Sequence, residues 1–396
     1  MSITTPTDIK YELNPAIPPF LPVILAIIAF LSLCWLAFPF GGWRYVIASF
    51  IGLFAGFALY HASFGFTAGW RRIVTERRGN GLRAQMLLIL IVCALSYPLI
   101  AYGKTWNLGE WNMRSGAFVF PFGVGSAVGA FIFGVGMQLG GSCASGTLFT
   151  AGGGSTRMMI TLASFVAGSV FGTAHLNFWN ELPRFDAFST INNYGPAIAF
   201  LLTAVFVMVV VVWSIKRERE AHGDLEPLRK TGNLITGPWS LVLGALALVV
   251  VSIGTILTLG RPWGITSGFV LWGAKAASAL GVDMSVANFW HSKINVSQSV
   301  FSNSTSIMNM SIILGALLAA GLASKFKPVL AIGWKGLATA IIGGLMMGYG
   351  ARLASGCNIG AYLAGIVSGS LHGWFWGIFA FIGSTLMSFG KIKWKL

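Results

Sequence analysis

Long apolar stretches recur along almost the whole chain, and each is long enough to cross a lipid bilayer as a helix. Of the 396 residues, 55% are hydrophobic and only 9% are charged, a balance that excludes an ordinary soluble domain. The sequence therefore predicts an all-α, polytopic helical membrane protein, and we expect it in the inner membrane of the cell. The predicted spans are Phe20–Phe40, Tyr45–Phe64, Ala84–Tyr102, Phe118–Leu139, Met158–Phe178, Ala197–Trp213, Ser240–Leu259, Gly264–Leu280, Ser306–Ala323, Val329–Gly350 and His372–Phe389.

Basic residues gather in three short segments beside these spans. The net charge is +15, and its largest clusters lie at Arg71–Arg83, at Lys216–Lys230 and at Lys391–Lys395. Clusters of Lys and Arg next to a span mark the cytoplasmic side of a membrane protein. The distribution therefore predicts contact with a lipid bilayer and no nucleic-acid partner, with all three segments in the cytoplasm.

The number of spans between these segments tests that orientation. Four predicted spans separate Arg71–Arg83 from Lys216–Lys230, as an even number should if both face the same side. Five predicted spans then precede the basic C-terminal end, which is an odd number. One segment must therefore be re-entrant, either Gly264–Leu280 or the stretch after Asn288, unless one of the basic segments lies on the other side.

Two copies of one motif lie 214 residues apart. Gly134–Gly146 and Gly348–Gly360 both fit G-x-G-x-x-L-x-x-x-C-x-x-G, and the cysteines are Cys143 and Cys357. A duplicated Gly/Cys element within apolar sequence is typical of two related halves whose broken helices meet at a binding site.

Matched glycines and serines extend the repeat beyond the motif. Gly129 and Gly343 share the offset of 214, whereas Gly168-Ser169 and Gly383-Ser384 share an offset of 215. We therefore expect two pseudo-symmetric halves with re-entrant Gly/Cys segments, and the Lys-rich C-terminus favours an inverted relation between them. The predicted parts are an N-terminal tail with the first span (1–40), a first repeat half (41–215), a charged cytoplasmic linker (216–234) and a second repeat half (235–396).

Each motif interrupts its apolar run with small and polar residues. Non-helical backbone survives at membrane depth only where it is buried in protein or lines a watery cavity. If each interruption leads into a helix, the free N–H groups and the positive dipole end of that helix form an anion site. The residues predicted to bind substrate in this way are Ser142, Cys143, Ser145 and Gly146 in the first copy, and Gly356, Cys357, Asn358 and Gly360 in the second.

A thiol at such a site is a weak donor with a soft, polarizable sulfur, which suits an anion that itself carries sulfur. We expect neutral thiols, because a thiolate would repel an incoming anion in a low-dielectric path. Arg352, five residues before Cys357, is a further predicted substrate contact, since an intramembrane cation attracts an anion; it or Lys275 could equally reach the interface.

Other cysteine chemistry has weaker support. Cys34 and Cys93 lie in plain apolar runs and are expected to be packing residues. Nothing in the sequence demands a disulfide, and no C-x-x-C or clustered histidine predicts a metal site. We expect no cofactor, no metal, no catalytic residues and no enzymatic activity.

These motifs resemble those of the YeeE/YedE family of sulfur-compound permeases, whose best-understood members take up thiosulfate. The resemblance covers nearly the whole chain and is strongest at Gly134–Gly146, Ala151–Ser155, Gly348–Gly360 and Ser370–Ser384. It implies an hourglass-shaped helical bundle in which cysteines pass thiosulfate along a central path by transient hydrogen bonds. Cys143 and Cys357 match two of those cysteines.

The chain also departs from the family pattern. A third cysteine usually stands in an Arg-Phe-Cys motif at the end of an early helix, and here the matching residues are Ser63-Phe64-Gly65. An acidic residue that often follows the first motif is replaced within Ala151–Gly154. Another group, such as Ser63 or the backbone of Gly65, would then contact the ion, or the substrate would be a related sulfur anion.

Three functions therefore remain open at this point. The first is a permease for thiosulfate or a closely related small sulfur-containing inorganic anion. The second is a membrane sulfur-transfer protein that forms a cysteine persulfide, and the third is a selective channel for a small solute. A cytoplasmic sulfur-carrier or sulfurtransferase protein is an expected partner for the first two.

Overall fold

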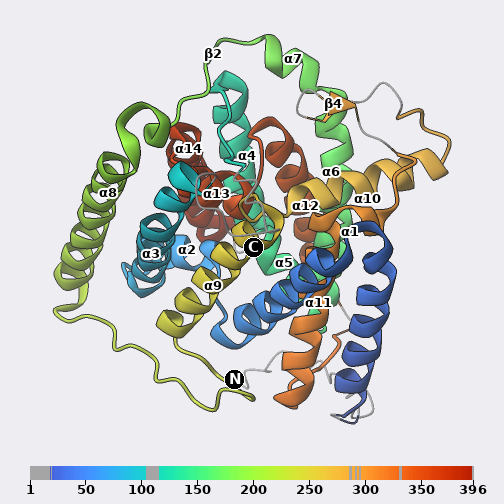
Figure 1. Ribbon diagram of the computed structural model, residues 1–396. Helices are drawn as coiled ribbons and strands as arrows, with labels where there is room; N and C mark the ends of the chain where they lie inside the picture. The colour runs from blue at the N-terminus through green and yellow to red at the C-terminus, as the bar shows by residue number, and fades with distance from the viewer. Residues whose placement is uncertain are drawn as a thin grey trace, which may run out of the picture.

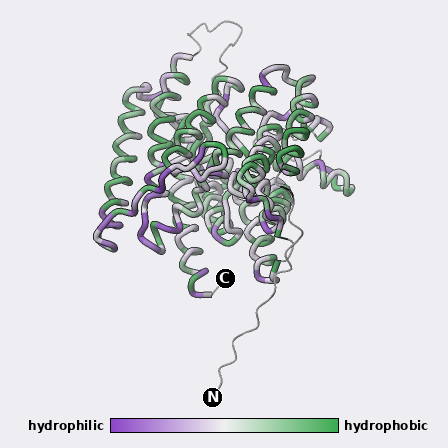
Figure 2. Tube along the Cα trace, turned by 90° about the horizontal axis from the view of Figure 1, so that it is seen from below, coloured by the Kyte–Doolittle hydropathy of each residue, from purple (hydrophilic) through white to green (hydrophobic). Residues whose placement is uncertain are grey.

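Helices form nearly all of the structure, a computed structural model that describes residues 18, 20–103, 116–284, 288–289, 292–293, 296–329 and 332–394. Among these residues, nine helices are long and apolar enough to cross a membrane, which confirms the predicted polytopic helical fold. The helices are apolar along most of their length, and hydrophilic residues gather at their ends (Figure 2). Residues 1–17 of the predicted N-terminal tail, Lys395, and residues 290, 291, 294 and 295 of the stretch after Asn288 lie outside the described part.

The first predicted half begins with a helix that is sharply bent. In α1 (Phe20–Ala62), Gly42 takes the left-handed value φ 55°, so the helix contains two arms that correspond to the first two predicted spans. The first arm of α1 stands at one edge of the ribbon view and α8 at the opposite edge (Figure 1). The other helices of this half are α2 (Phe66–Thr75), α3 (Asn80–Tyr102), α4 (Val124–Gly140), α5 (Ala144–Gly152), α6 (Thr156–Ala174), α7 (Leu176–Glu181) and α8 (Thr190–His222).

The second predicted half also contains both long and short helices. They are α9 (Leu241–Leu259), α10 (Thr266–Ala279), η1 (Val300–Ser302), α11 (Ser304–Leu322), α12 (Trp334–Leu353), η2 (Asn358–Leu363), α13 (Ala364–Val367) and α14 (Leu371–Trp394). Two short antiparallel ladders complete the described structure, and they pair β1 (Phe122–Gly123) with β2 (Arg184–Phe185) and β3 (Asn288–Phe289) with β4 (Ser292–Lys293).

The short helix α10 explains the odd number of predicted spans in this half. It has 14 residues, which at about 1.5 Å per residue is too short for a hydrocarbon core of about 30 Å. Of the described helices after the linker, only α9, α11, α12 and α14 belong to segments of membrane length. Their even number agrees with a linker and a basic C-terminal end on the same side.

Glycines let the central helices of the two halves approach closely. A methyl group on Gly129 of α4 would lie 2.8 Å from the carbonyl oxygen of Gly350 on α12, and one on Gly136 would lie 2.9 Å from that of Gly343. The order of these contacts shows that α4 and α12 run antiparallel. Because the two pairs exchange positions under the offset of 214, the contacts support related halves, while the two-fold axis itself stays a prediction.

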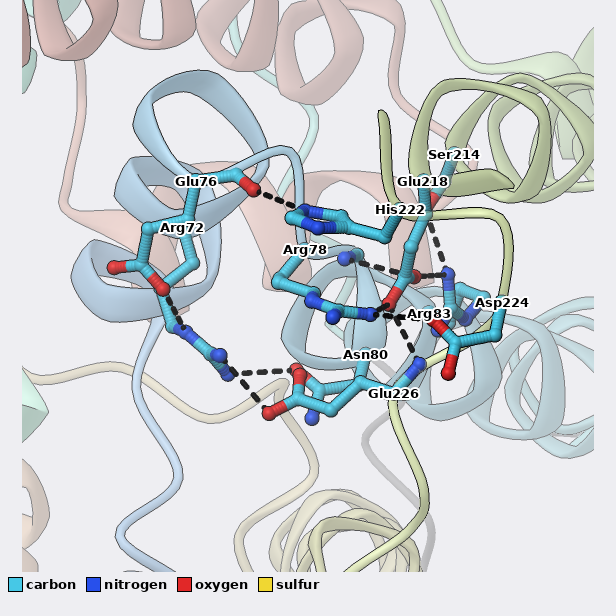
Figure 3. A network of polar contacts seen from close by, with 11 residues as sticks. Arg72, Glu76, Arg78, Asn80, Arg83, Ser214, Glu218, His222, Asp224 and Glu226 are labelled. Carbon is cyan, nitrogen blue, oxygen red and sulfur yellow. Dashed lines mark hydrogen bonds and ion pairs between the residues drawn. The ribbon is translucent and has the colours of Figure 1, made fainter. Parts of the chain in front are cut away.

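A buried carboxylate fastens α8 and the linker to the loop between α2 and α3 (Figure 3). Glu218 on α8 is fully buried and pairs with Arg83 at 2.6 Å and with Arg78 at 3.3 Å. It also accepts hydrogen bonds from the backbone N–H groups of Gly79 and Glu226. The two basic segments that the sequence placed on one side are therefore in direct contact, and we name the side that carries them the basic face.

Removing this carboxylate should destabilise the protein. We expect Glu218→Ala to lower the free energy of unfolding by about 3 kcal/mol, because two arginines would be left without their buried partner. Thermal unfolding in detergent, followed by intrinsic fluorescence, measures the change. Glu220→Ala is the matched control, since the Glu220 carboxylate is half exposed and lies 3.9 Å from Lys216. Equal melting temperatures for the two variants would contradict the role of Glu218.

Candidate functional site

The first Gly/Cys motif forms a break between two helices. Gly141 ends α4 in the left-handed conformation, with φ 92°, and its N–H donates to the carbonyl of Met137 at 3.1 Å. Ser142 continues the break, and Cys143 is the N-cap residue of the short helix α5. The predicted interruption of the apolar run is therefore present as non-helical backbone.

The second motif forms a matching break. After α12, Ser355 and Gly356 both have positive φ values, 59° and 147°, and the N–H of Gly356 donates to the carbonyl of Ala351 at 2.8 Å. Cys357 is then the N-cap residue of η2, a π-helical turn that continues into α13. Each cysteine thus begins a half-helix directly after a non-helical break.

Both half-helices present uncapped N-termini. Neither Cys143 nor Cys357 donates or accepts a side-chain capping bond, whereas the ordinary spans α6 and α9 are capped by Ser155 and Ser240. Uncapped N–H groups together with the helix dipole favour a bound anion.

The two thiols are buried beside small polar groups. Cys143 is 1% exposed, and its Sγ lies 3.5 Å from Oγ of Ser145. A methyl group on Gly146 would meet Oγ of Ser142 and lie 3.5 Å from this sulfur, so the missing side chain keeps the first turn of α5 open. This break therefore brings together all four residues predicted for the first motif.

The second thiol has an equivalent setting. Cys357 is fully buried, like Cys143. Asn358 is also fully buried, and neither atom of its side-chain amide has a hydrogen-bond partner among the residues that the structure describes. The α5 helix contacts η2, so the two breaks meet in the middle of the protein. All four cysteines are free thiols.

Arg352 lies at the end of α12, one turn before the second break. It is 1% exposed, and its Nε donates to Oγ1 of Thr173 on α6 at 2.9 Å. The predicted cation is therefore buried inside the protein, on a helix of membrane length. Lys275, the other candidate cation, instead donates to the carbonyl of Val296 at 2.9 Å.

A cavity of about 580 Å³ leads from the basic face to the first break. Gly141 and Ser142 form part of its wall, and its charged lining residues are all cationic: Arg229, Lys325 and Lys327. No acidic side chain belongs to the described lining. A cavity lined by one sign of charge concentrates ions of the opposite sign.

A second cavity, of about 280 Å³, adjoins the second break. Leu353 and Ser355 of the break line it, and its charged lining residues are Arg352 and Arg184. Trp179 of α7 and the β1 strand form other parts of the wall. The protein therefore has two cationic cavities, each of which reaches one Gly/Cys break.

Arg184, Arg229, Lys325 and Lys327 are lining residues that the sequence did not reveal. They lie far from the Gly/Cys motifs along the chain, and a charge beside a span indicates orientation without showing which cavity it will line. No group of three His, Cys, Asp or Glu side chains in the described ranges is placed to hold a metal ion.

Comparison with known proteins identifies the family of the chain. The sulphur transport family matches residues 61–386. The chain belongs to this family. It is therefore a multi-pass membrane transporter of sulfur compounds and not an enzyme.

Relatives of this chain are named as transporters. A thiosulfate transporter, TsuA of Escherichia coli, is 26% identical over 84% of the chain and 90% of its own length. TsuA of Spirochaeta thermophila is also 26% identical, over 85% of the chain and 96% of its own length. A probable transporter, YedE of Escherichia coli, is 31% identical, but over only 37% of the chain and 36% of its own length.

Gly65, which the resemblance matches to a third family cysteine, also lies at a cavity. Gly65 is the N-cap residue of α2, and both Gly65 and Ser63 line the cavity on the basic face. A methyl group on Gly65 would meet nothing within 4 Å, so this transporter leaves open space where the family pattern has a side chain.

The backbone of the second break requires glycine. Gly356→Ala should lower the free energy of unfolding by about 1–3 kcal/mol, because the positive φ is unfavourable for alanine and the new methyl would lie 2.8 Å from the nitrogen of Ala361. Gly333→Ala is the control, since a methyl there meets nothing within 4 Å and φ is −64°. Thermal unfolding in detergent distinguishes them, and a Gly356→Ala protein as stable as the control would show that the break tolerates a side chain.

Proposed function

We propose that this protein is a permease for thiosulfate or a closely related small sulfur-containing inorganic anion. The observation that carries the proposal is the pair of buried thiols, Cys143 and Cys357, each at the uncapped start of a half-helix between two cationic cavities. The names of the two TsuA relatives support thiosulfate as the first substrate to test.

Charge selects the class of substrate. An anion entering either cavity meets only cationic charged lining residues, and it then reaches N–H groups at the positive end of a helix dipole. The substrate-binding residues in this proposal are those of the two breaks, namely Ser142, Cys143, Ser145, Gly146, Gly356, Cys357, Asn358 and Gly360, together with Arg352. Helix N–H groups and Arg352 provide strong donors for the oxygen atoms of the ion.

The thiols select for sulfur within that class. A neutral thiol donates a weak hydrogen bond and presents a polarizable surface, which matches the terminal sulfur of thiosulfate better than a hard oxyanion. Weak binding also allows release, which a conducting path requires. The ion would pass from one thiol to the other, since α5 and η2 are in contact.

The orientation follows from the basic segments. The linker and the α2–α3 loop would face the cytoplasm of a cell whose inner membrane holds the protein, by the positive-inside rule. The cavity near Lys325 and Lys327 would then release the ion to the cytoplasm. A sulfur-carrier or sulfurtransferase protein that consumes the anion would dock at this face.

Loss of either central thiol should impair transport. In proteoliposomes, we expect Cys143→Ala and Cys357→Ala each to slow thiosulfate uptake at least about tenfold, the scale of one lost hydrogen bond to an ion. Cys34→Ala, on the first arm of α1, is the matched control because Cys34 lies away from both breaks. Uptake at the wild-type rate in both central variants would rule out a thiol path.

The same preparation separates the alternatives. A gain of one sulfur atom in the intact mass of the wild-type protein after exposure to thiosulfate would indicate a cysteine persulfide and a sulfur-transfer role. An absence of counterflow, with uptake intact, would indicate a channel instead of a carrier.

The cations of the basic-face cavity should set affinity. We expect reversal of charge in Lys325→Glu and Lys327→Glu to raise the half-saturating thiosulfate concentration several-fold, most strongly at low ionic strength, where charges are least screened. Lys335→Glu is the control, because Lys335 is exposed at the start of α12 and does not line the cavity. If all three variants change uptake equally, the effect comes from overall charge and not from the cavity.

A further inference from the structure

A second duplicated motif accompanies the cysteine motif. Gly65–Trp70 and Gly264–Phe269 both read G-x-T-x-G followed by an aromatic residue. The first begins α2 and the second begins α10, and neither helix has a side-chain cap at its N-terminus. Like α5 and η2, α2 and α10 are short helices that begin inside the bundle.

Matching amide side chains hold both segments. Nε2 of Gln85 donates to the carbonyl of Gly65 at 3.2 Å, and Nδ2 of Asn309 donates to the carbonyl of Ile265 at 2.8 Å. Gln85 and Asn309 occupy the sixth position of α3 and of α11, and they bond the carbonyls of the first and of the second motif residue, respectively, so the two contacts are similar but one residue apart. The repeated anchor fixes where each G-x-T segment begins.

Each G-x-T segment lies beside a Gly/Cys break. Gly65 and Thr67 share the wall of the basic-face cavity with Ser142, and Nε2 of Gln138, from α4, donates to the carbonyl of Thr67 at 3.0 Å. On the other side, a methyl group on Gly360 would lie 3.8 Å from Cα of Gly264.

Polar atoms without partners mark both places. Oγ1 of Thr67 is buried without a hydrogen-bond partner in the described part of the chain, although Thr67 as a residue lines the cavity. Near the second break, the side-chain amide of Asn358 and the Oδ1 atom of Asn309 are likewise buried without a hydrogen-bond partner among the described residues. Buried polar atoms in a native protein normally have partners, so unpartnered atoms beside the two breaks indicate groups kept for a passing ligand.

We infer that the path contains two binding stations, each built from one thiol half-helix and one G-x-T half-helix. The basic-face station joins Cys143 with Thr67, and the opposite station joins Cys357 and Asn358 with the start of α10. This inference rests on the proposed function and assigns the two ends of the anion. The thiol contacts the terminal sulfur, while the Thr67 hydroxyl and the Asn358 amide donate to oxygen atoms.

The chemistry of the donors supports this division. Hydroxyl and amide groups are stronger donors than a thiol, and oxygen atoms of a sulfur oxyanion are harder acceptors than its terminal sulfur. An ion held at both ends is distinguished from sulfate, which offers no soft end, and from sulfide, which offers no oxygen. Thr67 thereby takes up part of the role left by the missing thiol at Gly65.

The hydroxyl of Thr67 can be removed with little change in shape. We expect Thr67→Val to raise the half-saturating thiosulfate concentration about tenfold in proteoliposomes, the scale of one hydrogen bond to a charged group. Thr67→Ser, which keeps a hydroxyl, should restore a value near wild type. Thr255→Val is the matched control, because Thr255 is equally buried but bonds the carbonyl of Val251 in its own helix.

The outcomes separate the inference from the function. A wild-type protein that takes up no thiosulfate would refute the proposed permease itself. Uptake by the wild type with an unchanged half-saturating concentration in Thr67→Val would refute the station while leaving the permease in place. A lower maximal rate without rescue by serine would show a structural role for Thr67 and would also overturn it.

A second variant keeps the test available if Thr67→Val does not fold. Asn358→Ala, at the opposite station, should likewise raise the half-saturating concentration about tenfold, since it removes an amide donor to the anion. The protein recovered in the folded, monodisperse fraction is compared with Thr255→Val. An Asn358→Ala protein with wild-type half-saturation would contradict the opposite station.

Discussion

An exposed helix N-terminus cannot persist in a membrane without a partner, and the centre of this protein is arranged around that constraint. Water satisfies free N–H groups in a soluble protein, but the hydrocarbon core offers no such partner. The half-helices that begin at Cys143 and Cys357 therefore need either protein groups or a watery path in front of them. The structure places a cationic cavity beside each break, and in the proposed permease the helix ends and the cavity linings would together admit anions and repel cations.

Close helix packing lowers the energetic cost of these breaks. Non-helical backbone within a membrane must be surrounded by protein, and bulky side chains would hold the surrounding helices apart. At the crossing of α4 and α12, glycines allow the two backbones to approach directly, with Gly129 against Gly350 and Gly136 against Gly343. The duplicated glycines that revealed the repeat are thus also the residues that seal the bundle around the site.

The long helices and the two Gly/Cys breaks could be predicted from the sequence, whereas the cationic residues of the cavities could not. Apolar length located the long helices, and the Gly/Cys motif located both breaks, because each signal is local along the chain. Arg229, Lys325 and Lys327 could not be found in this way, since their convergence on one cavity depends on how the linker and the segment after α11 fold against α1. The G-x-T repeat is also visible in the sequence. A search for cysteine motifs does not find it, because its first copy has Gly65 where the family pattern has a cysteine.

The two halves differ in charge at a pair of matched residues, and this difference determines where the cations beside each break come from. Arg352 and Gln138 are 214 residues apart, and both are buried where α12 or α4 approaches its break. Gln138 donates to the carbonyl of Thr67, whereas Arg352 donates to the hydroxyl of Thr173 and brings a cation to the second cavity. On the basic face the cations come instead from the linker and from the segment after α11. In the proposed permease, an anion would therefore meet a cation built into a membrane helix on one side and loop cations on the other. This asymmetry would give the two sides different affinities, while the direction of net flux would still follow the gradient or its coupling to another process.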